Sequence, residues 1–443
     1  MVKSCTMNSP STAERQAFAS SVARRQRAQL SWSLTGLAWI ACAYGLGLWF
    51  QREQWATHYF PMTILWCVLP YLLASHWLYR GAGVPVNERI GLLIVTTGMP
   101  FLLTPLGFAL LQQPYSRGAV LLVYILSLAW FGLGERRHRR LHVPRLACLD
   151  DSVPARLQSL VGASAVQRQS VELTPWTCKP GDPLPELGTL DGVVVDTSAA
   201  GSEARSELLS QLKLSHVRLY SVDALAEMLT GRKMLPSSEN ELWQLDGNPA
   251  YDVVKRIMDM AAVLITLPLT VPLSLLVATA VRLDSPGPAL FSQERVGLNG
   301  RSFRLWKFRS MQHAPGPATA SFARHQDPRV TRVGRFIRRS RLDELPQLWN
   351  VLIGDMSLIG PRPEQVQFVE NFAARIHAYP YRHLVRPGLT GWAQVLQGYA
   401  GNQEETAVKL SYDLYYVTHY SMALDLLIAF KTVRIVVGGF GAR

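Results

Sequence analysis

Long apolar stretches dominate the first part of the chain. Each is close to the ~20 residues that a helix needs to cross a ~30 Å hydrocarbon core. Short polar links separate the four stretches, which cover 30–50, 60–79, 90–111 and 119–134. Trp32, Trp49 and Trp77 lie near their ends, as is typical of side chains at a membrane–water interface. The pattern predicts four transmembrane helices within residues 30–134.

A fifth apolar run, residues 257–281, differs from the other four. Basic residues flank it on both sides, and Pro268 and Pro272 lie one turn apart near its centre. Each proline removes a backbone donor and pushes against the preceding turn, so we expect a bend. A bent, re-entrant helix over 253–282 would enter and leave the membrane on one side. It explains the positive flanks better than a straight span does.

The segment between these regions, residues 135–250, has the pattern of a soluble α/β unit. Strands are predicted at 192–196 and 217–221, and helices at 203–214 and 222–229. No phosphate-binding glycine loop accompanies them. A scaffold or regulatory module is therefore favoured over a second active site.

Lysine and arginine gather at the two ends of the four-span region. Residues 1–29 contain several arginines and residues 135–145 read ERRHRRLHVPR, whereas the short links contain few basic residues. Because cytoplasmic loops carry an excess of positive charge, both ends should face the cytoplasm, which four crossings allow. These patterns predict an α-helical membrane protein with an α/β insert. Its parts are an N-terminal arm, four transmembrane helices, a cytoplasmic α/β domain and a mainly helical catalytic domain that begins with the re-entrant helix: 1–29, 30–134, 135–250 and 251–443.

The composition agrees with a membrane location. Of the 443 residues, 48% are hydrophobic and only 17% are charged, yet the formal net charge is +13. A chain of this length is expected to contain two or three domains. An apolar, strongly basic chain fits a membrane protein that binds phosphates or acidic lipids. The five cysteines show no CxxC spacing, which argues against a disulfide scaffold or a zinc site.

Positive charge is concentrated between Arg295 and Arg341. Asp327 is the single acidic residue among the many arginines and lysines of this block. Phospholipid headgroups, a pyrophosphate substrate and nucleic acid are the candidate anions. Nucleic acid is disfavoured, because no recognised nucleic-acid-binding motif accompanies the charge. For most of the individual residues a solvated or lipid-facing surface remains the alternative.

The basic block ends at an acidic pair, Asp343 and Glu344. Pro346 fits the start of a helix that continues over residues 347–353. Asp343 is therefore expected near a helix N-terminus, where free N–H groups and the dipole favour the ionised carboxylate. A nucleophile toward phosphorus and a magnesium ligand both need that ionised form. A simple helix cap is the alternative for a single aspartate.

Two rigid loops follow the acidic pair. Gly360-Pro361-Arg362-Pro363 holds one arginine between two prolines, which lowers the entropy cost of directing its guanidinium at phosphate oxygens. Residues 386–392 read RPGLTGW and form a second, glycine-rich loop.

Taken together and in this order, the motifs of residues 251–443 closely resemble the bacterial sugar transferase family. These are the monotopic phosphoglycosyl transferases that prime capsule, O-antigen and exopolysaccharide synthesis. The four spans and the α/β insert look like those of the large, polytopic members. One departure is Val271-Pro272, where members commonly have Ser-Pro at the break of the re-entrant helix. The motifs that carry the resemblance are Lys255-Arg256 with Asp259, 284–288, 293–295, 307–311, 327–335, 342–350, 354–357, 360–363 and 387–394.

The resemblance implies a two-step reaction at the cytoplasmic face of a bacterial inner membrane. Asp343 would attack the sugar-linked phosphorus of a UDP-sugar and release UMP. Undecaprenyl phosphate would then take the sugar phosphate from the aspartyl intermediate. Asp343 and Glu344 are the implied catalytic residues and the candidate Mg²⁺ ligands. The residues expected to bind substrate phosphates are Lys307, Arg309, Arg338, Pro361, Arg362 and Pro363.

Two other functions stay open at this point. A catalytically silent membrane scaffold of a polysaccharide assembly complex has no physical need for adjacent carboxylates beside Arg362. A basic regulator that binds nucleic acid would show salt-sensitive DNA binding without nucleotide-sugar turnover. The sequence leaves open the sugar, the polysaccharide pathway and the role of residues 146–247. A homo-oligomer that pairs through the membrane or α/β portions is compatible with it.

Overall fold

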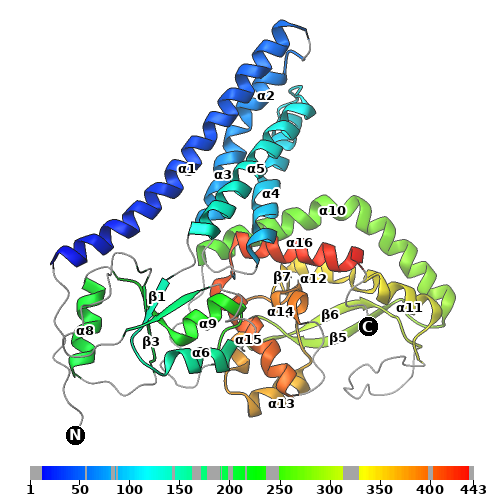
Figure 1. Ribbon diagram of the computed structural model, residues 1–443. Helices are drawn as coiled ribbons and strands as arrows, with labels where there is room; N and C mark the ends of the chain where they lie inside the picture. Colours follow the sequence, from blue (N-terminus) through cyan, green and yellow to red (C-terminus); the bar gives the residue numbers. More distant parts are fainter. Residues whose placement is uncertain are drawn as a thin grey trace. The chain divides into compact units, whose positions relative to one another are not determined.

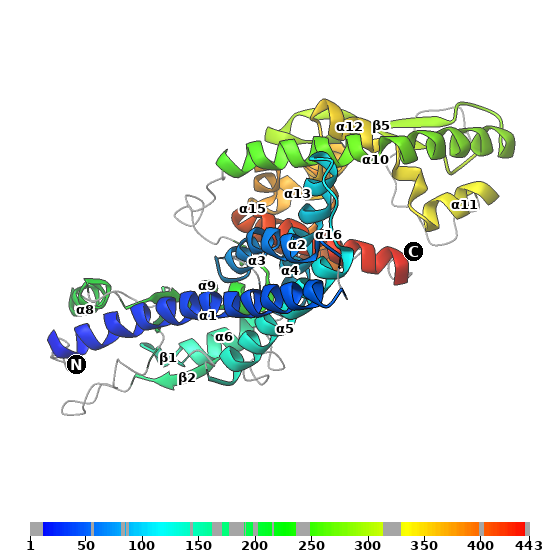
Figure 2. The same ribbon diagram turned by 90° about the horizontal axis from the view of Figure 1, so that it is seen from above.

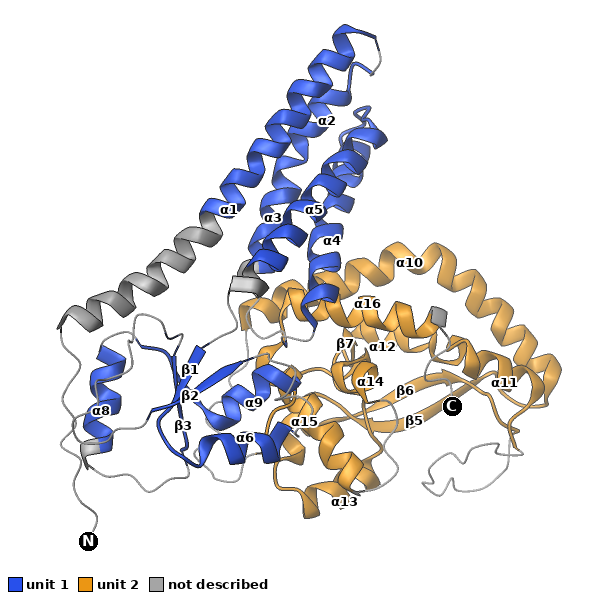
Figure 3. Cartoon of the chain, in the orientation of Figure 1, with its two compact units in different colours: residues 1–231 blue, residues 232–443 orange. Residues whose placement is uncertain are grey.

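The computed structural model forms two compact units, residues 1–231 and 232–443 (Figure 3). Residues 1–11 of the N-terminal arm, and Asp327 with the rest of 313–328, lie outside the described residues. The structure describes residues 12–54, 57–80, 85, 88–141, 145–161, 171–176, 190, 192–197, 203–214, 217–235, 249–312, 329–397 and 403–438.

The first unit begins with helices that correspond to the four predicted spans. The first, α1 (Thr12–Arg52), also includes much of the predicted polar arm. The second span consists of two helices, α2 (Phe60–Trp66) and α3 (Val68–Arg80). The third and fourth are α4 (Arg89–Leu110) and α5 (Arg117–Leu141). Together with α10 of the second unit, the described residues contain 5 stretches long and apolar enough to cross a membrane.

The second predicted span is interrupted at Cys67, which the apolar pattern did not predict. Pro70 has no N–H to donate to the carbonyl of Trp66, four residues earlier. The N–H of Tyr71 bonds to the Cys67 carbonyl at 3.1 Å, so helical bonding resumes one residue later. The proline therefore explains the interruption.

A four-stranded parallel sheet lies at the centre of the α/β domain of the first unit. Its strand order is β2 (Glu172–Pro175), β1 (Arg145–Cys148), β3 (Gly192–Val195) and β4 (Leu219–Ser221). The predicted strands at 192–196 and 217–221 are confirmed as β3 and β4. β1 and β2 were not predicted.

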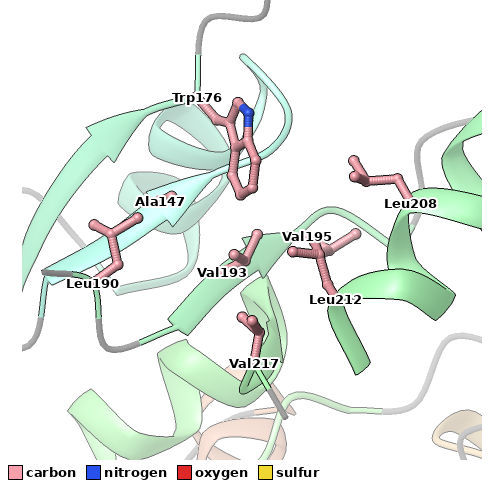
Figure 4. Close-up of a cluster of buried hydrophobic side chains, with 8 residues drawn as sticks. All are labelled: Ala147, Trp176, Leu190, Val193, Val195, Leu208, Leu212 and Val217. Atoms are coloured by element: carbon pink, nitrogen blue, oxygen red, sulfur yellow. The ribbon is translucent and has the colours of Figure 1, made fainter. Parts of the chain in front are cut away.

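Helices cover both faces of this sheet (Figure 1). α8 (Glu203–Leu214) packs Leu208 and Leu212 against Val193 and Val195 (Figure 4). α6 (Val153–Val161) and α9 (Val222–Thr230) contact each other on the opposite side of the strands. The predicted helices at 203–214 and 222–229 are thus confirmed.

The second unit begins with α10 (Pro249–Asp284), a 36-residue helix that contains Pro268 and Pro272. Figure 1 shows this helix bent into an arch, whereas Figure 2, which looks down on it, shows it running in nearly one line. The bend that the two prolines predict is therefore present.

Both halves of α10 pack against the body of the second unit. Val263 of the first half lies in a buried cluster with Val351. Val277 of the second half lies in another buried cluster with Ile337. Between these contacts the arch presents apolar side chains outward, and Leu269 is 72% exposed.

Polar side chains near the start of α10 fasten it to the same body. Lys255 pairs with Asp425, Arg256 donates to the carbonyl of Leu352 at 2.7 Å, and Asp259 accepts from the N–H of Leu358 at 3.2 Å. These three motif residues therefore hold the start of α10 against the rest of the second unit.

The rest of the second unit combines short strands with helices. The elements are β5 (Leu290–Val296), η4 (Leu298–Gly300), β6 (Ser302–Phe308), α11 (Arg332–Arg339), η5 (Leu342–Glu344), α12 (Gln347–Ile353), β7 (Ser357–Ile359), α13 (Val366–Arg375), η6 (Tyr379–Leu384), β8 (Gly388–Thr390), α14 (Trp392–Leu396), α15 (Gln403–His419) and α16 (Met422–Gly438). β5 and β6 form an antiparallel hairpin, and β7 and β8 form a parallel pair.

Candidate active site

The acidic pair lies in η5, one turn of 3-10 helix between α11 and α12. Asp343 is 9% exposed and Glu344 is 7% exposed. Arg341, directly before the turn, has a left-handed backbone conformation with φ 58°. Such a conformation is uncommon for a residue other than glycine and is found mostly where the surroundings enforce it. The helix predicted over 347–353 is confirmed as α12.

The start of α11 is fixed by two caps and one close approach. The Gly334 N–H donates to the Thr331 hydroxyl at 2.9 Å, and the Val333 N–H donates to Asp284 at 3.1 Å. Both bonds satisfy N–H groups that have no partner within the helix. A β-carbon on Gly334 would lie 2.0 Å from the carbonyl oxygen of Ser310, so only glycine fits here.

Glu344 is surrounded by three positive side chains. Its Oε1 lies 2.8 Å from Nη2 of Arg362, 3.5 Å from Nη1 of Arg341 and 3.7 Å from Nζ of Lys307. Burial alone would raise the pKa of Glu344, but the cations outweigh burial and bring this pKa down to about 2. Glu344 is therefore ionised at neutral pH.

Asp343 has a different environment from its neighbour. Its Oδ1 is buried and has no hydrogen-bond partner among the described residues. Burial, and then the charge of Glu344, raise the pKa of Asp343, against the opposing effect of Lys307, Arg341 and Arg338. The prediction that a helix N-terminus would favour the ionised form is wrong in direction, because the acidic turn precedes α12 and burial dominates.

Lys307 reaches Glu344 from β6, and Asn350 of α12 holds that strand. Asn350 is fully buried; its Nδ2 donates to the Arg304 carbonyl at 2.7 Å, and its Oδ1 accepts from the Trp306 N–H at 3.2 Å. The amide thus bonds to the edge of β6 as a neighbouring strand would. Burial and the nearby Arg362 lower the pKa of Lys307 to about 8.

The two rigid loops, predicted separately, form one structure. The Gly360 N–H donates to the Thr390 carbonyl at 2.8 Å, and the Gly388 N–H donates to the Pro361 carbonyl at 2.9 Å. A β-carbon on Gly388 would lie 2.0 Å from the nitrogen of Gly360, so the two backbones meet only because glycine is present. The turn that carries Arg362 is fixed on this base.

The other predicted substrate-binding residues have distinct positions. Pro361 and Pro363 are buried on either side of Arg362. Arg338 lies in the last turn of α11, where its charge acts on Asp343. Arg338, Arg362 and Lys307 therefore act on the acidic pair, whereas the two prolines hold the turn that carries Arg362.

Arg309, predicted to face substrate phosphates, instead caps the end of α10. Its guanidinium donates to the carbonyls of Pro286, Ser285 and Val281. Only 7% of this residue is exposed. Because the last carbonyls of a helix have no intrahelical partner, we assign Arg309 a structural role in place of a phosphate contact.

A second set of charges lies behind the proline-flanked turn, and the sequence did not predict it. Glu364 pairs with Lys409 and lies 3.7 Å from Arg295. Arg382 lies 2.7 Å from Asp413. These residues come from separate segments of the chain, so no local motif joins them. Arg295 was noticed as a member of the basic block and of the motif 293–295, but neither signal indicated its pairing with Glu364.

The acidic pair suits a magnesium ion only in part. Mg²⁺ is usually held by one or two carboxylates together with substrate phosphates and water. The unpartnered Oδ1 of Asp343, next to the ionised Glu344, fits that arrangement. The described residues contain no group of three or more candidate metal ligands. A metal here would therefore depend on substrate phosphates for further ligands.

Comparison with known proteins identifies the family. Residues 250–439 match the sequence model of the family described as bacterial sugar transferase. The UDP-N-acetylgalactosamine-undecaprenyl-phosphate N-acetylgalactosaminephosphotransferase of Aeromonas hydrophila is 41% identical to this chain, over 84% of this chain and 86% of the relative. The chain belongs to the bacterial sugar transferase family.

Two further relatives match a shorter part of this sugar transferase. The UDP-glucose:undecaprenyl-phosphate glucose-1-phosphate transferase of Escherichia coli K12 is 42% identical over 42% of each chain. The exopolysaccharide production protein PSS of Rhizobium leguminosarum bv. phaseoli is 40% identical over 41% of this chain and 94% of the relative. Membership makes the chain an enzyme, and the residues matched by the family contain the whole site described above.

Proposed function

We propose that this sugar transferase moves a sugar 1-phosphate from a UDP-sugar to undecaprenyl phosphate and releases UMP. The reaction would be the priming step of an exopolysaccharide, capsule or O-antigen. The names of the relatives support this donor and acceptor class, since several are undecaprenyl-phosphate sugar transferases. The observation that carries the proposal is the carboxylate oxygen of Asp343 that has no hydrogen-bond partner in the described part of the chain and lies beside Glu344 and its three cations.

In the first step, Oδ1 of Asp343 attacks the sugar-linked phosphorus of the donor. The bond from that phosphorus to the bridging oxygen breaks, and UMP leaves with the bridging oxygen. In the second step, an oxygen of undecaprenyl phosphate attacks the same phosphorus. The bond to Asp343 then breaks, which restores the carboxylate and leaves a lipid-linked pyrophosphate sugar.

The raised pKa of Asp343 suits a nucleophile, because a more basic carboxylate shares its electron pair more readily. Glu344 is not free to play the same part, since its Oε1 already accepts from Arg362 at 2.8 Å. Instead it holds Arg362 and Lys307 next to the reacting phosphates, where their charges offset the negative charge of the transition state.

Magnesium is part of the proposal, with Asp343 and Glu344 as the carboxylates that would hold it. The ion, when bound, would supply positive charge to the donor phosphates. Among the described residues, Lys307, Arg362 and Arg341 supply positive charge beside Glu344, and the charge of Arg338 acts on Asp343.

We also propose that α10 enters and leaves the membrane on one side. A straight helix of 36 residues is about 54 Å long. A straight span would therefore carry its two ends to opposite sides of a ~30 Å hydrocarbon core. Val263 and Val277, which belong to opposite halves of α10, nevertheless both pack against the second unit. The exposed apolar arch between them would lie in the lipid of a bacterial inner membrane, with the active site on the cytoplasmic side.

The direct test is UMP release from a panel of UDP-sugars by purified protein in the presence of undecaprenyl phosphate. The proposal predicts UMP release with at least one donor and a lipid-linked pyrophosphate sugar as the second product. A silent scaffold would release no UMP with any donor. Failure with the full panel, while the purified Aeromonas hydrophila relative is active under the same conditions, would refute the proposed function.

A further inference from the structure

The main chain of the turn that carries Arg362 is held from behind by two arginines. Nη2 of Arg382, from η6, donates to the Arg362 carbonyl at 2.9 Å. Nη1 of Arg295, from β5, donates to the next carbonyl, that of Pro363, at 3.2 Å. The turn is therefore fixed by charged donors on one side, while the Arg362 side chain reaches Glu344 on the other.

Arg382 is itself buried and fixed by its own partners. Arg382 and Asp413 are each 2% exposed, and Nη2 of Arg382 lies 2.7 Å from Oδ2 of Asp413. Nη1 donates to the Tyr379 hydroxyl at 3.0 Å, and the guanidinium lies 5.2 Å from the centre of the Tyr379 ring. The planar fork of arginine is what allows one side chain to make all these contacts in a fixed geometry.

Stability alone does not account for this arrangement. Replacing a buried ion pair by well-packed apolar side chains is often neutral or stabilising, because the attraction barely repays the loss of hydration. A second binding site does not account for it either. The cavity beside Arg382 and Asp413 has a volume of about 30 Å³, which admits water but not a nucleotide.

We propose that Arg382, held by Asp413, is a positioning residue that directs Arg362 toward Glu344 and the reacting phosphates. The inference rests on the proposed function, because Arg362 is placed there as the cation that offsets developing phosphate charge. The contacts of Arg382 in the described part of the chain are with the Arg362 carbonyl, Asp413 and Tyr379, so it acts on the site through the Arg362 carbonyl. Asp413 fixes the orientation of the Arg382 guanidinium.

The test replaces the buried pair by apolar side chains in the full-length protein, as Arg382→Met together with Asp413→Leu. We expect the pair variant to stay folded, with a thermal stability lowered only by the loss of the Arg382 hydrogen bonds to the Arg362 carbonyl and the Tyr379 hydroxyl. The kcat/KM for UMP release should fall roughly tenfold, because the turn that positions Arg362 loses one hydrogen bond from a charged donor. Arg375→Lys, at an exposed position of α13, is the matched control and should leave both quantities unchanged.

A double-mutant cycle with Arg362→Ala separates positioning from a merely structural role. If Arg382 acts through Arg362, the pair replacement should lower kcat/KM by less than a further twofold in the Arg362→Ala background. Equal losses in the two backgrounds, or a stable pair variant with wild-type kcat/KM, would overturn the proposal. If the pair variant does not fold, the same cycle with Arg382→Lys decides, since lysine keeps the charge beside Asp413 but lacks the fork. Absence of UMP release by wild type would refute the proposed function instead.

Discussion

Replacing Arg362 with alanine removes the shortest of the three cation contacts to Glu344, the 2.8 Å hydrogen bond from Nη2 to Oε1. A hydrogen bond with a charged partner contributes about 1.5–3 kcal/mol. Stranding a buried charge completely costs about 3–5 kcal/mol. Glu344 is not stranded, because Arg341 at 3.5 Å and Lys307 at 3.7 Å remain. We therefore expect Arg362→Ala to lose about 2–3 kcal/mol of transition-state stabilisation, which corresponds to roughly a 30- to 150-fold loss of kcat/KM.

Stability should change in the same variant, with a defined pH dependence. The pKa of Glu344 is about 2 in the folded chain against an ordinary 4.5. This difference contributes about 3 kcal/mol to the free energy of unfolding when the carboxylate is ionised. Because the folded pKa is the lower, this contribution is complete above about pH 5 and is lost as the pH falls toward 2. Arg362→Ala raises the folded pKa. The gap in free energy of unfolding between wild type and variant should therefore be full near neutral pH and shrink below about pH 4.5.

The assay combines initial rates of UMP release with thermal unfolding in detergent between pH 3 and pH 7. Arg375→Ala, which removes an exposed arginine from α13, serves as the control for loss of a positive charge. A kcat/KM within fivefold of wild type would mean that Arg362 does not act on the reacting phosphates. A stability gap that grows as the pH falls would show that the charge of Glu344 is not what Arg362 stabilises.

Three further predictions concern other parts of the second unit. Lys307 has a pKa of about 8, below the ordinary 10.5, so its charge, and with it UMP release, should be lost as the pH rises through about 8. In the Lys307→Arg variant, UMP release should persist above pH 9, because arginine stays charged there. Asn350→Leu removes the fully buried amide that bonds to the Arg304 carbonyl and the Trp306 N–H. It should lower the free energy of unfolding by about 1–3 kcal/mol, as measured by thermal unfolding, and reduce turnover through Lys307. Cysteines introduced as Ser20→Cys and Asn299→Cys in a cysteine-free chain should react with an impermeant reagent from the same side of the membrane; labelling from opposite sides would exclude a re-entrant α10.

Local patterns in the sequence predicted elements that depend on neighbouring residues. The helix over 347–353, the two α/β strands at 192–196 and 217–221 and the bend in α10 follow from proline positions and runs of apolar residues. β1 and β2 are as short as β3, but their sequences, RLAC and ELTP, lack the continuous run of valines that makes β3 recognisable.

The site depends on contacts that no local pattern encodes. The two glycine-rich loops were found separately, but only the structure shows that Gly360 and Gly388 meet backbone to backbone. Arg309 had the same sequence signal as Lys307, since both belong to one basic block, yet it caps α10. The pKa of Asp343 was predicted in the wrong direction, because its burial arises from the packing of distant segments around the turn.

Covalent capture at Asp343 tests the central claim most directly. Purified protein is mixed with a UDP-sugar labelled in the sugar-linked phosphate, without acceptor lipid, and is then quenched in acid and digested. The account predicts label on the peptide that contains Asp343, removal of that label by added undecaprenyl phosphate, and no label on the Asp343→Asn variant. UMP release at full rate without labelled protein, or turnover by Asp343→Asn, would contradict it.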